Sequence, residues 1–196
     1  MHYSIIKKNQ EPRMSYIGKA LMIGDPTVGK TSILAQYVDG IFREEYYQTI
    51  GANFLIKEIE LVKIIDKINV SEEIRNNIIE KGLKLYFWDI GGQSDKLFVT
   101  EYYFVQAVGA MVVFNVNDEK SFDNIDFWIS KVKELSGEIP FVIVGNKADL
   151  NKSIDQQKIE EKVSHYGVEY YETSAKLNVN IDKAFQALSV QILNHF

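Results

Sequence analysis

The segment GDPTVGKT, residues 24–31, constrains the fold of this chain more than any other feature. Its Gly24, Gly29, Lys30 and Thr31 satisfy G-x-x-x-x-G-K-[ST], the pattern of a phosphate-binding loop. Such a loop lies between a strand and a helix, so that its backbone N–H groups surround phosphates at the positive end of the helix. An apolar run precedes the segment and a stretch with helical spacing follows it, which disfavours a chance match in a glycine-bearing turn. We expect Lys30 to reach the β- and γ-phosphates and the Thr31 hydroxyl to ligate Mg²⁺.

A second motif, VGNKADL at residues 144–150, follows an apolar run and indicates which base is bound. The carboxylate of Asp149 can accept hydrogen bonds from guanine N1–H and from its exocyclic amine, a pair of donors that adenine lacks. Asn146 is a candidate either for a contact with N7 of the base or for bracing the loops. The stem of Lys147 can lie along the plane of the base. Together with the phosphate loop, the motif predicts a guanine nucleotide.

Sensing the third phosphate requires a segment that changes when that phosphate leaves, and WDIGGQ at residues 88–93 is the candidate. Asp89 would hold Mg²⁺ through water, Gly92 would donate its backbone N–H to the γ-phosphate, and Gln93 would orient the attacking water. A glycine pair here can also be a plain turn at a strand end, with Gln93 in solvent. Thr49, in YYQTIGANF, would ligate Mg²⁺ through its hydroxyl and contact the γ-phosphate through its N–H.

Two weaker signals would complete the nucleotide site. Phe42 is a candidate to stack against the edge of the base. The segment ETSAK, residues 172–176, follows another apolar run, and the N–H groups of Ala175 or Lys176 can meet guanine O6. Neither signal is specific alone, and both depend on the phosphate loop and the base motif.

Apolar runs rich in β-forming residues alternate with amphipathic stretches, as in an α/β fold whose mainly parallel sheet carries helices on both faces. We therefore predict a P-loop nucleotide-binding fold with a six-stranded, mostly parallel sheet. The expected strands are 16–24, 52–61, 85–90, 110–116, 141–146 and 168–173. The expected helices lie within 31–42, 121–135, 155–166 and 178–196, with Ser121 as an N-cap and with Ile181, Phe185 and Leu188 on one buried face.

The segment from about residue 62 to residue 82 is too long for a short connection and carries its own helix signals. Ser71 before two glutamates is typical of a helix N-terminus, and Gly82 of its end. The face formed by Ile74, Ile78 and Ile79 can cap the sheet edge or a neighbouring helix, which is the favoured interpretation, or form a partner surface. We expect one domain over residues 1–196, with an N-terminal extension at 1–14 and this insertion.

Composition excludes several classes of function. The net charge of -5 argues against a nucleic-acid binder, which usually carries a basic face. The chain has no cysteine, which excludes disulfides, thiolate metal sites and cysteine nucleophiles and fits a reducing interior. No apolar run approaches the roughly 20 residues that a membrane span needs, so we expect a cytoplasmic protein. The three histidines, His2, His165 and His195, are isolated and are expected at the surface.

The combination of these motifs resembles the Ras-like small GTPases over about residues 16–194. All five family motifs occur in order, and the segments GDPTVGKTS, TIGANF and EYYFVQAVGAMVVFNVNDEKSF are most similar to the Rab branch. In Rab proteins the aromatics corresponding to Phe54, Trp88 and Tyr103 form an effector-sensing patch; here they can equally be core. The resemblance implies a G domain that binds GTP or GDP with Mg²⁺, and effectors, exchange factors or activating proteins at the switch regions.

The chain departs from the Rab pattern at several places. WDIGGQSDK is more similar to the Arf branch, because Rab-type chains usually carry Ala at the position of Gly91 and Glu at that of Ser94. Pro26 stands where the family often has Gly or Ser, and its fixed φ limits crowding near Gln93, so we expect turnover to survive. The two ends of this sequence carry no prenylatable cysteine and no glycine after Met1, so membrane association is expected only through partners or a tail beyond this sequence.

These observations predict a GTP-binding switch that hydrolyses GTP slowly, at about 10⁻⁴ to 10⁻² per second without a partner. The alternative is an interaction module or scaffold with little useful turnover, and a further one is an adenine-nucleotide P-loop enzyme. The predicted catalytic residues are Gln93, Lys30 and Thr49, and the predicted metal ligands are Thr31, Thr49 and Asp89. The predicted nucleotide-binding residues are Gly24, Asp25, Thr27, Val28, Gly29, Lys30, Thr31, Ser32, Phe42, Thr49, Gly92, Asn146, Lys147, Asp149, Ser174, Ala175 and Lys176.

Overall fold

The computed structural model describes residues 16–42, 56–63, 65–91 and 101–195. They form a six-stranded sheet in the order β2-β3-β1-β4-β5-β6. Strands β1, β3, β4, β5 and β6 run parallel, and β2 pairs antiparallel with β3 at one edge. The strands are β1 (Tyr16–Ile23), β2 (Ile56–Glu60), β3 (Leu83–Asp89), β4 (Ala107–Asn115), β5 (Phe141–Asn146) and β6 (Tyr170–Glu172). The predicted α/β fold with a mostly parallel six-stranded sheet is confirmed.

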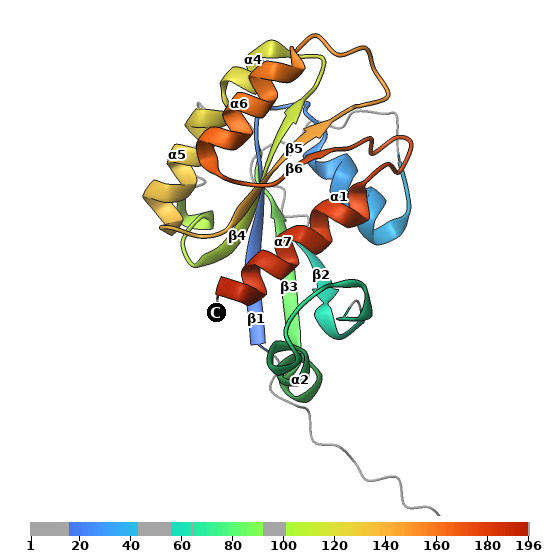
Figure 1. The fold of residues 1–196 in the computed structure, drawn as a ribbon, viewed down its shortest axis with the longest axis vertical. Helices are drawn as coiled ribbons and strands as arrows, with labels where there is room; N and C mark the ends of the chain where they lie inside the picture. Colours follow the sequence, from blue (N-terminus) through green and yellow to red (C-terminus); the bar gives the residue numbers. More distant parts are fainter. Residues whose placement is uncertain (1–15, 43–55, 64, 92–100, 196) are drawn as a thin grey trace, which may run out of the picture.

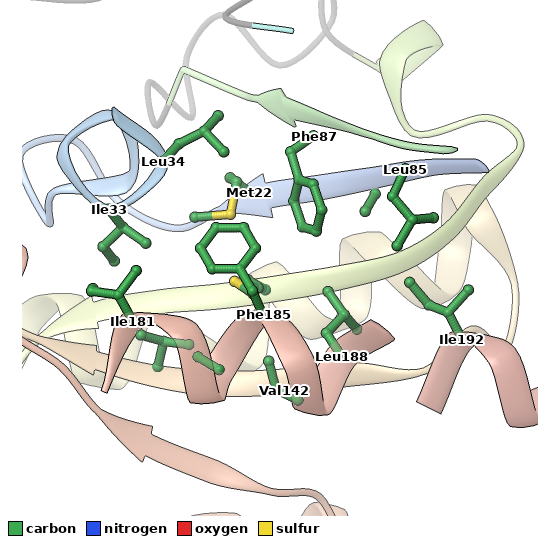
Figure 2. Close-up of a cluster of buried hydrophobic side chains, with 14 of the residues drawn as sticks. Met22, Ile33, Leu34, Leu85, Phe87, Val142, Ile181, Phe185, Leu188 and Ile192 are labelled. Atoms are coloured by element: carbon green, nitrogen blue, oxygen red, sulfur yellow. The ribbon is translucent and has the colours of Figure 1, made fainter. Parts of the chain in front are cut away.

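Helices cover both faces of the sheet (Figure 1). On one face lie α1 (Lys30–Asp39) and α7 (Ile181–His195), and on the other α4 (Glu119–Asp123), α5 (Ile125–Ser136) and α6 (Gln156–Tyr166). Side chains alternate along β1, so that Met22 belongs to the core cluster under α1 and α7 while Leu21 belongs to the cluster under the other helices. Figure 2 shows the first cluster, in which Phe185 of α7 points toward Met22 and Phe87 of the sheet. A layer of apolar side chains thus lies between each face of the sheet and its helices.

The ends of the parallel strands explain where a ligand can bind. In the pairing of β1 with β3, Met22 lies opposite Asp89, one residue before the end of β1. In the pairing of β4 with β5, Asn115 lies opposite Asn146. Because β1, β3 and β5 all run parallel, the residues that follow them emerge at the same edge of the sheet, where open α/β folds bind their ligands.

The connection between β2 and β3 contains the predicted helix. Two short 3₁₀ turns, Leu61–Lys63 and Ile65–Lys67, precede α2 (Glu72–Lys81). Ser71 caps α2 by accepting a hydrogen bond from the N–H of Ile74, and Gly82 ends it at a φ of 73°. Ile78 is buried in the cluster under α7, whereas Ile79 is 48% exposed. This part of the chain therefore extends the core through Ile78, whereas Ile79 of the predicted face does not join the core.

The predicted single helix over 121–135 is wrong in one respect. The structure has two helices there, which meet at Asn124, and Ser121 is not an N-cap. Asp118 caps α4 by accepting from the N–H of Lys120, while the buried hydroxyl of Ser121 donates to the carbonyl oxygen of Asp118. Asp118 takes the capping role because α4 begins at Glu119, so that the carboxylate of Asp118 lies beside the free N–H of Lys120. None of the helices in the described ranges is both long and apolar enough to cross a membrane.

Candidate nucleotide-binding site

The loop between β1 and α1 has a backbone that only glycine can follow at two positions. Gly24 has a φ of 138°, and a Cβ there would stand 2.0 Å from the carbonyl oxygen of Val113. Gly29 has a φ of 99°, and its Cβ would stand 2.3 Å from Nδ2 of Asn146. The two glycines of the phosphate-loop pattern are therefore required by close packing against β4 and against Asn146 at the end of β5. Between them Val28 is buried, whereas Thr27 is exposed at a φ of 64°.

Lys30 lies inside the curled loop. Its Nζ donates to the carbonyl oxygens of Gly24 at 2.7 Å and of Asp25 at 2.8 Å, and the residue is only 6% exposed. Burial lowers the pKa of Lys30 to about 8, although the nearby charges of Asp89 and Asp25 oppose the shift. An ammonium group held in this way lacks the hydration it would have in water. A phosphate bound in the loop would supply the missing negative charge.

Thr31 and Asp89 meet at the start of α1. The Thr31 hydroxyl donates to Oδ2 of Asp89, and Asp89 is 2% exposed. Burial raises the pKa of this carboxyl, while the charge of Lys30 and the hydrogen bond from Thr31 act in the opposite direction. A carboxylate and a hydroxyl beside a phosphate-binding loop are the hard oxygen ligands that Mg²⁺ takes, with the nucleotide phosphates and water as the remaining ligands. The residues present therefore fit the metal.

Asn146 joins three separate segments of the chain. Its Nδ2 donates to the carbonyl oxygen of Val28 at 2.9 Å, across the phosphate loop. Its Oδ1 accepts from the hydroxyl of Thr173 and from the N–H of Ala175, both at 3.2 Å. The side chain is buried, and these three bonds show that it braces the loops, which is one of its two predicted roles, while the contact with N7 of the base stays a prediction. The phosphate loop and the base loops are thereby held in one unit.

Asp149 lies at the open side of this unit. The hydroxyl of Ser174 donates to its Oδ1 at 2.6 Å, and the N–H of Leu177 in turn donates to that hydroxyl at 3.1 Å. Asp149 itself is exposed, so a ligand can reach its carboxylate from solvent. Lys147 adopts a φ of 65° beside it, and burial lowers the pKa of its ammonium group against the opposing charges of Asp118 and Asp149. The structure therefore fixes a carboxylate oxygen and a half-buried lysine stem next to each other.

The other predicted residues differ in how far they are exposed and in what they pack against. Ser32 is half-buried in the first turn of α1, and Lys176 is exposed beside the buried Ala175. Phe42 is half-buried and packs against the core cluster under α1 and α7. The rings of Trp88 and Tyr103 lie 5.9 Å apart between centroids. The predictions for Thr49, Phe54, Gly92, Gln93 and Ser94 fall outside the described residues.

Sequence reasoning missed two features of the site. The hydroxyl of Thr173, directly before the predicted Ser174, donates to Oδ1 of Asn146, which also accepts from the N–H of Ala175. Asp25 was predicted as a nucleotide-binding residue, and its carboxylate also accepts hydrogen bonds from Asn124 and Trp128 of the helical layer, which sequence reasoning did not predict. A signal for the second feature was present, because a carboxylate inside an anion-binding loop needs hydrogen-bond donors from elsewhere in the fold.

Comparison with known proteins agrees with this geometry. A model of the Ras family matches residues 19–194. Rab-8A from Bos taurus is 36% identical over 180 residues, which are 90% of this chain and 79% of the relative. Rab-8B from Homo sapiens is 35% identical over 181 residues, which cover 91% of this chain and 79% of the relative. Rab-8 from Diplobatis ommata is 34% identical over 181 residues, with 91% and 78% covered. The chain therefore belongs to the Ras family, with its likeness in the Rab branch, and is a small GTPase that binds guanine nucleotide, hydrolyses GTP and acts as a nucleotide-dependent switch.

Proposed function

We propose that the phosphate loop and the base loops grip a single guanine nucleotide, with Mg²⁺ at its phosphates. The observation that carries the proposal is the position of Asn146, whose amide group bonds to Val28 on the phosphate side and to Ala175 on the base side. A buried side chain that bridges both loops fixes their separation. Two loops at a fixed separation can select a ligand that carries a ring at one end and phosphates at the other.

Guanine selection rests on Asp149. One of its carboxylate oxygens is oriented by Ser174, and the exposed carboxylate can accept from both N1–H and the exocyclic amine of guanine. Adenine offers no such pair of donors, so its nucleotides would leave the carboxylate unpaired. The N–H of Ala175 or Lys176 is proposed to donate to O6 of the base, and the stem of Lys147 is proposed to lie along the ring.

Phosphate and metal binding rest on Lys30, Thr31 and Asp89. The buried ammonium group of Lys30 is placed to attract the phosphates, and Thr31 and Asp89 would hold Mg²⁺ through their oxygens. When bound, the metal neutralises the charge that develops on the phosphate oxygens during transfer. Thr49 is proposed as the further ligand, on the basis of the family resemblance of the segment around it.

Hydrolysis is proposed to depend on Gln93, which would orient the attacking water, and on Gly92, whose N–H would sense the γ-phosphate. Effectors, exchange factors and activating proteins would then read the segments around Thr49 and Gln93. We further propose that the whole chain forms one domain that works in the cytoplasm and reaches membranes through its partners.

Single-turnover phosphate release tests the catalytic half of the proposal. The protein is loaded with GTP in the presence of EDTA, Mg²⁺ is added, and inorganic phosphate is measured over time for the unchanged chain and for Gln93→Ala. Gln157→Ala is a matched control, because Gln157 is an exposed glutamine on α6 whose side chain donates to Glu161 and whose N–H donates to Asp155, both in its own segment. We expect release to slow at least tenfold in Gln93→Ala and to stay unchanged in the control. Equal rates for all three chains would contradict the assigned role of Gln93.

A further inference from the structure

The phosphate loop is tied to the helical layer on the far side of the sheet through one carboxylate. Nδ2 of Asn124 donates to Oδ2 of Asp25 at 2.7 Å, and Nε1 of Trp128 donates to Oδ1 at 2.8 Å. The two donors lie 99 and 103 residues further along the chain. Both oxygens of Asp25 are therefore occupied by neutral N–H donors, and each bond joins a charged acceptor, which makes it stronger than a bond between neutral groups.

The local structure explains why these two donors meet at one place. Asn124 is the junction residue between α4 and α5, with a φ of -76° and a ψ of -2°, and its own N–H donates to carbonyl oxygens of α4. Trp128 lies four positions later on α5, so the two side chains project from the same face of the helix. The Trp128 ring is 1% exposed within the core cluster that also contains Ile129. A buried indole N–H needs an acceptor, and Asp25 provides it.

The other end of Asp25 reaches the residue that binds phosphate. The carbonyl oxygen of Asp25 accepts from Nζ of Lys30 at 2.8 Å. Asp25 is therefore bonded to Asn124 and Trp128 through its side chain and to Lys30 through its main chain. Pro26 follows directly with a φ that its ring fixes, and Thr27 comes next at a φ of 64°, a region that a β-branched residue rarely adopts. A loop with this strained turn needs an external restraint to keep its shape.

We propose that Asn124 and Trp128 are positioning residues for nucleotide binding, which act through Asp25 to hold the phosphate loop open to the phosphates and Lys30 in place. Neither side chain touches the nucleotide in this arrangement. Helix α5 thereby sets the rate at which nucleotide leaves, and that rate is a property on which the switch depends. The inference rests on the proposed function of the phosphate loop.

The dissociation rate of a fluorescent GDP analogue, chased with excess GDP, tests the inference. Trp128→Phe removes the indole N–H and keeps an aromatic ring in the core, and Asn124→Ala removes the other donor at a half-buried position. Ile129→Val is the matched control, because Ile129 is the next residue of α5, is equally buried at 1% exposure and belongs to the same cluster. We expect dissociation to quicken by about tenfold in Trp128→Phe and in Asn124→Ala, the effect typical of losing a bond to a charged group, and to stay within about twofold in Ile129→Val.

The background of Asp25→Ala separates positioning from general destabilisation. If the two donors act through Asp25, then adding Trp128→Phe to Asp25→Ala leaves the dissociation rate unchanged, although melting temperatures still fall. Full additivity of the two effects, or Trp128→Phe with a lowered melting temperature and the dissociation rate of the unchanged chain, would overturn the inference. A failure of the proposed function is distinguishable, because the unchanged chain would then retain no guanine nucleotide at all.

Discussion

Removal of the Asn146 side chain should weaken nucleotide binding, because this one side chain holds three groups of the nucleotide loops. Asn146→Ala leaves three groups without their partner: the carbonyl oxygen of Val28, the hydroxyl of Thr173 and the N–H of Ala175. A buried group left unpaired costs about 1 to 3 kcal/mol, and water entering the space would recover part of it. We therefore expect a total loss of about 3 kcal/mol, which corresponds to roughly a 100-fold loss of GDP affinity if it falls wholly on the bound state.

The loss can instead fall on the free protein, so two measurements are needed. GDP affinity is measured by titration of the nucleotide-free chain, and thermal unfolding is followed in the absence of nucleotide. Ser189→Ala is the control, because its buried hydroxyl bonds to the carbonyl oxygen of Phe185 within α7 and lies in none of the nucleotide loops. We expect at least a tenfold loss of affinity in Asn146→Ala and less than a twofold change in the control. An Asn146→Ala chain that melts earlier yet binds GDP with unchanged affinity would refute the argument that Asn146 couples the two loops.

Two further predictions concern the rest of the fold. Ile78→Ala should lower the free energy of unfolding by about 2 to 4 kcal/mol because Ile78 is 4% exposed in the core, while Ile79→Ala on the same helix, at 48% exposure, should cost under about 0.5 kcal/mol in denaturant unfolding. Burial raises the pKa of Asp126, but hydrogen bonds from Lys162 and Tyr166 outweigh it and hold the pKa below its usual value. A lowered pKa in the folded state stabilises the fold above the unfolded value of about 4, so the melting temperature of Asp126→Asn should lie slightly below that of the unchanged chain at pH 7 and approach it as the pH falls toward 3.

Much of the fold could be predicted because its signals are local. The apolar run at 141–146 became β5 with the same bounds, and the cap and stop residues Ser71 and Gly82 delimit α2 as expected. Helix α7 buries Ile181, Phe185 and Leu188 on the predicted face. Boundaries were less accurate where two signals competed, as in the stretch that the structure divides at Asn124, because a capping choice depends on which side chain reaches the free N–H groups.

The parts of the site that a short sequence pattern defines could be predicted. The contacts between residues far apart in the sequence could not be predicted. Gly24 and Lys30 follow from a pattern of eight residues. The bond from Trp128 to Asp25 joins residues 103 positions apart, and no local pattern encodes it. Similarly, no local pattern encodes the hydrogen bonds by which Asn146 joins Val28 to Ala175.

The central claim is that the carboxylate of Asp149 binds the base while the phosphate loop, which Asn146 links to the base loops, binds the phosphates. Nucleotide selectivity tests this claim most directly. GDP, IDP and ADP are titrated against the nucleotide-free chain and against Asp149→Ala, with Asp155→Ala as a control because Asp155 is an exposed carboxylate that caps α6. IDP keeps N1–H and O6 but lacks the exocyclic amine, so the order of affinity should be GDP, then IDP by about tenfold, then ADP far below. In Asp149→Ala the preference for GDP over IDP should disappear. If Asp149→Ala discriminates among the three nucleotides as the unchanged chain does, the account is contradicted.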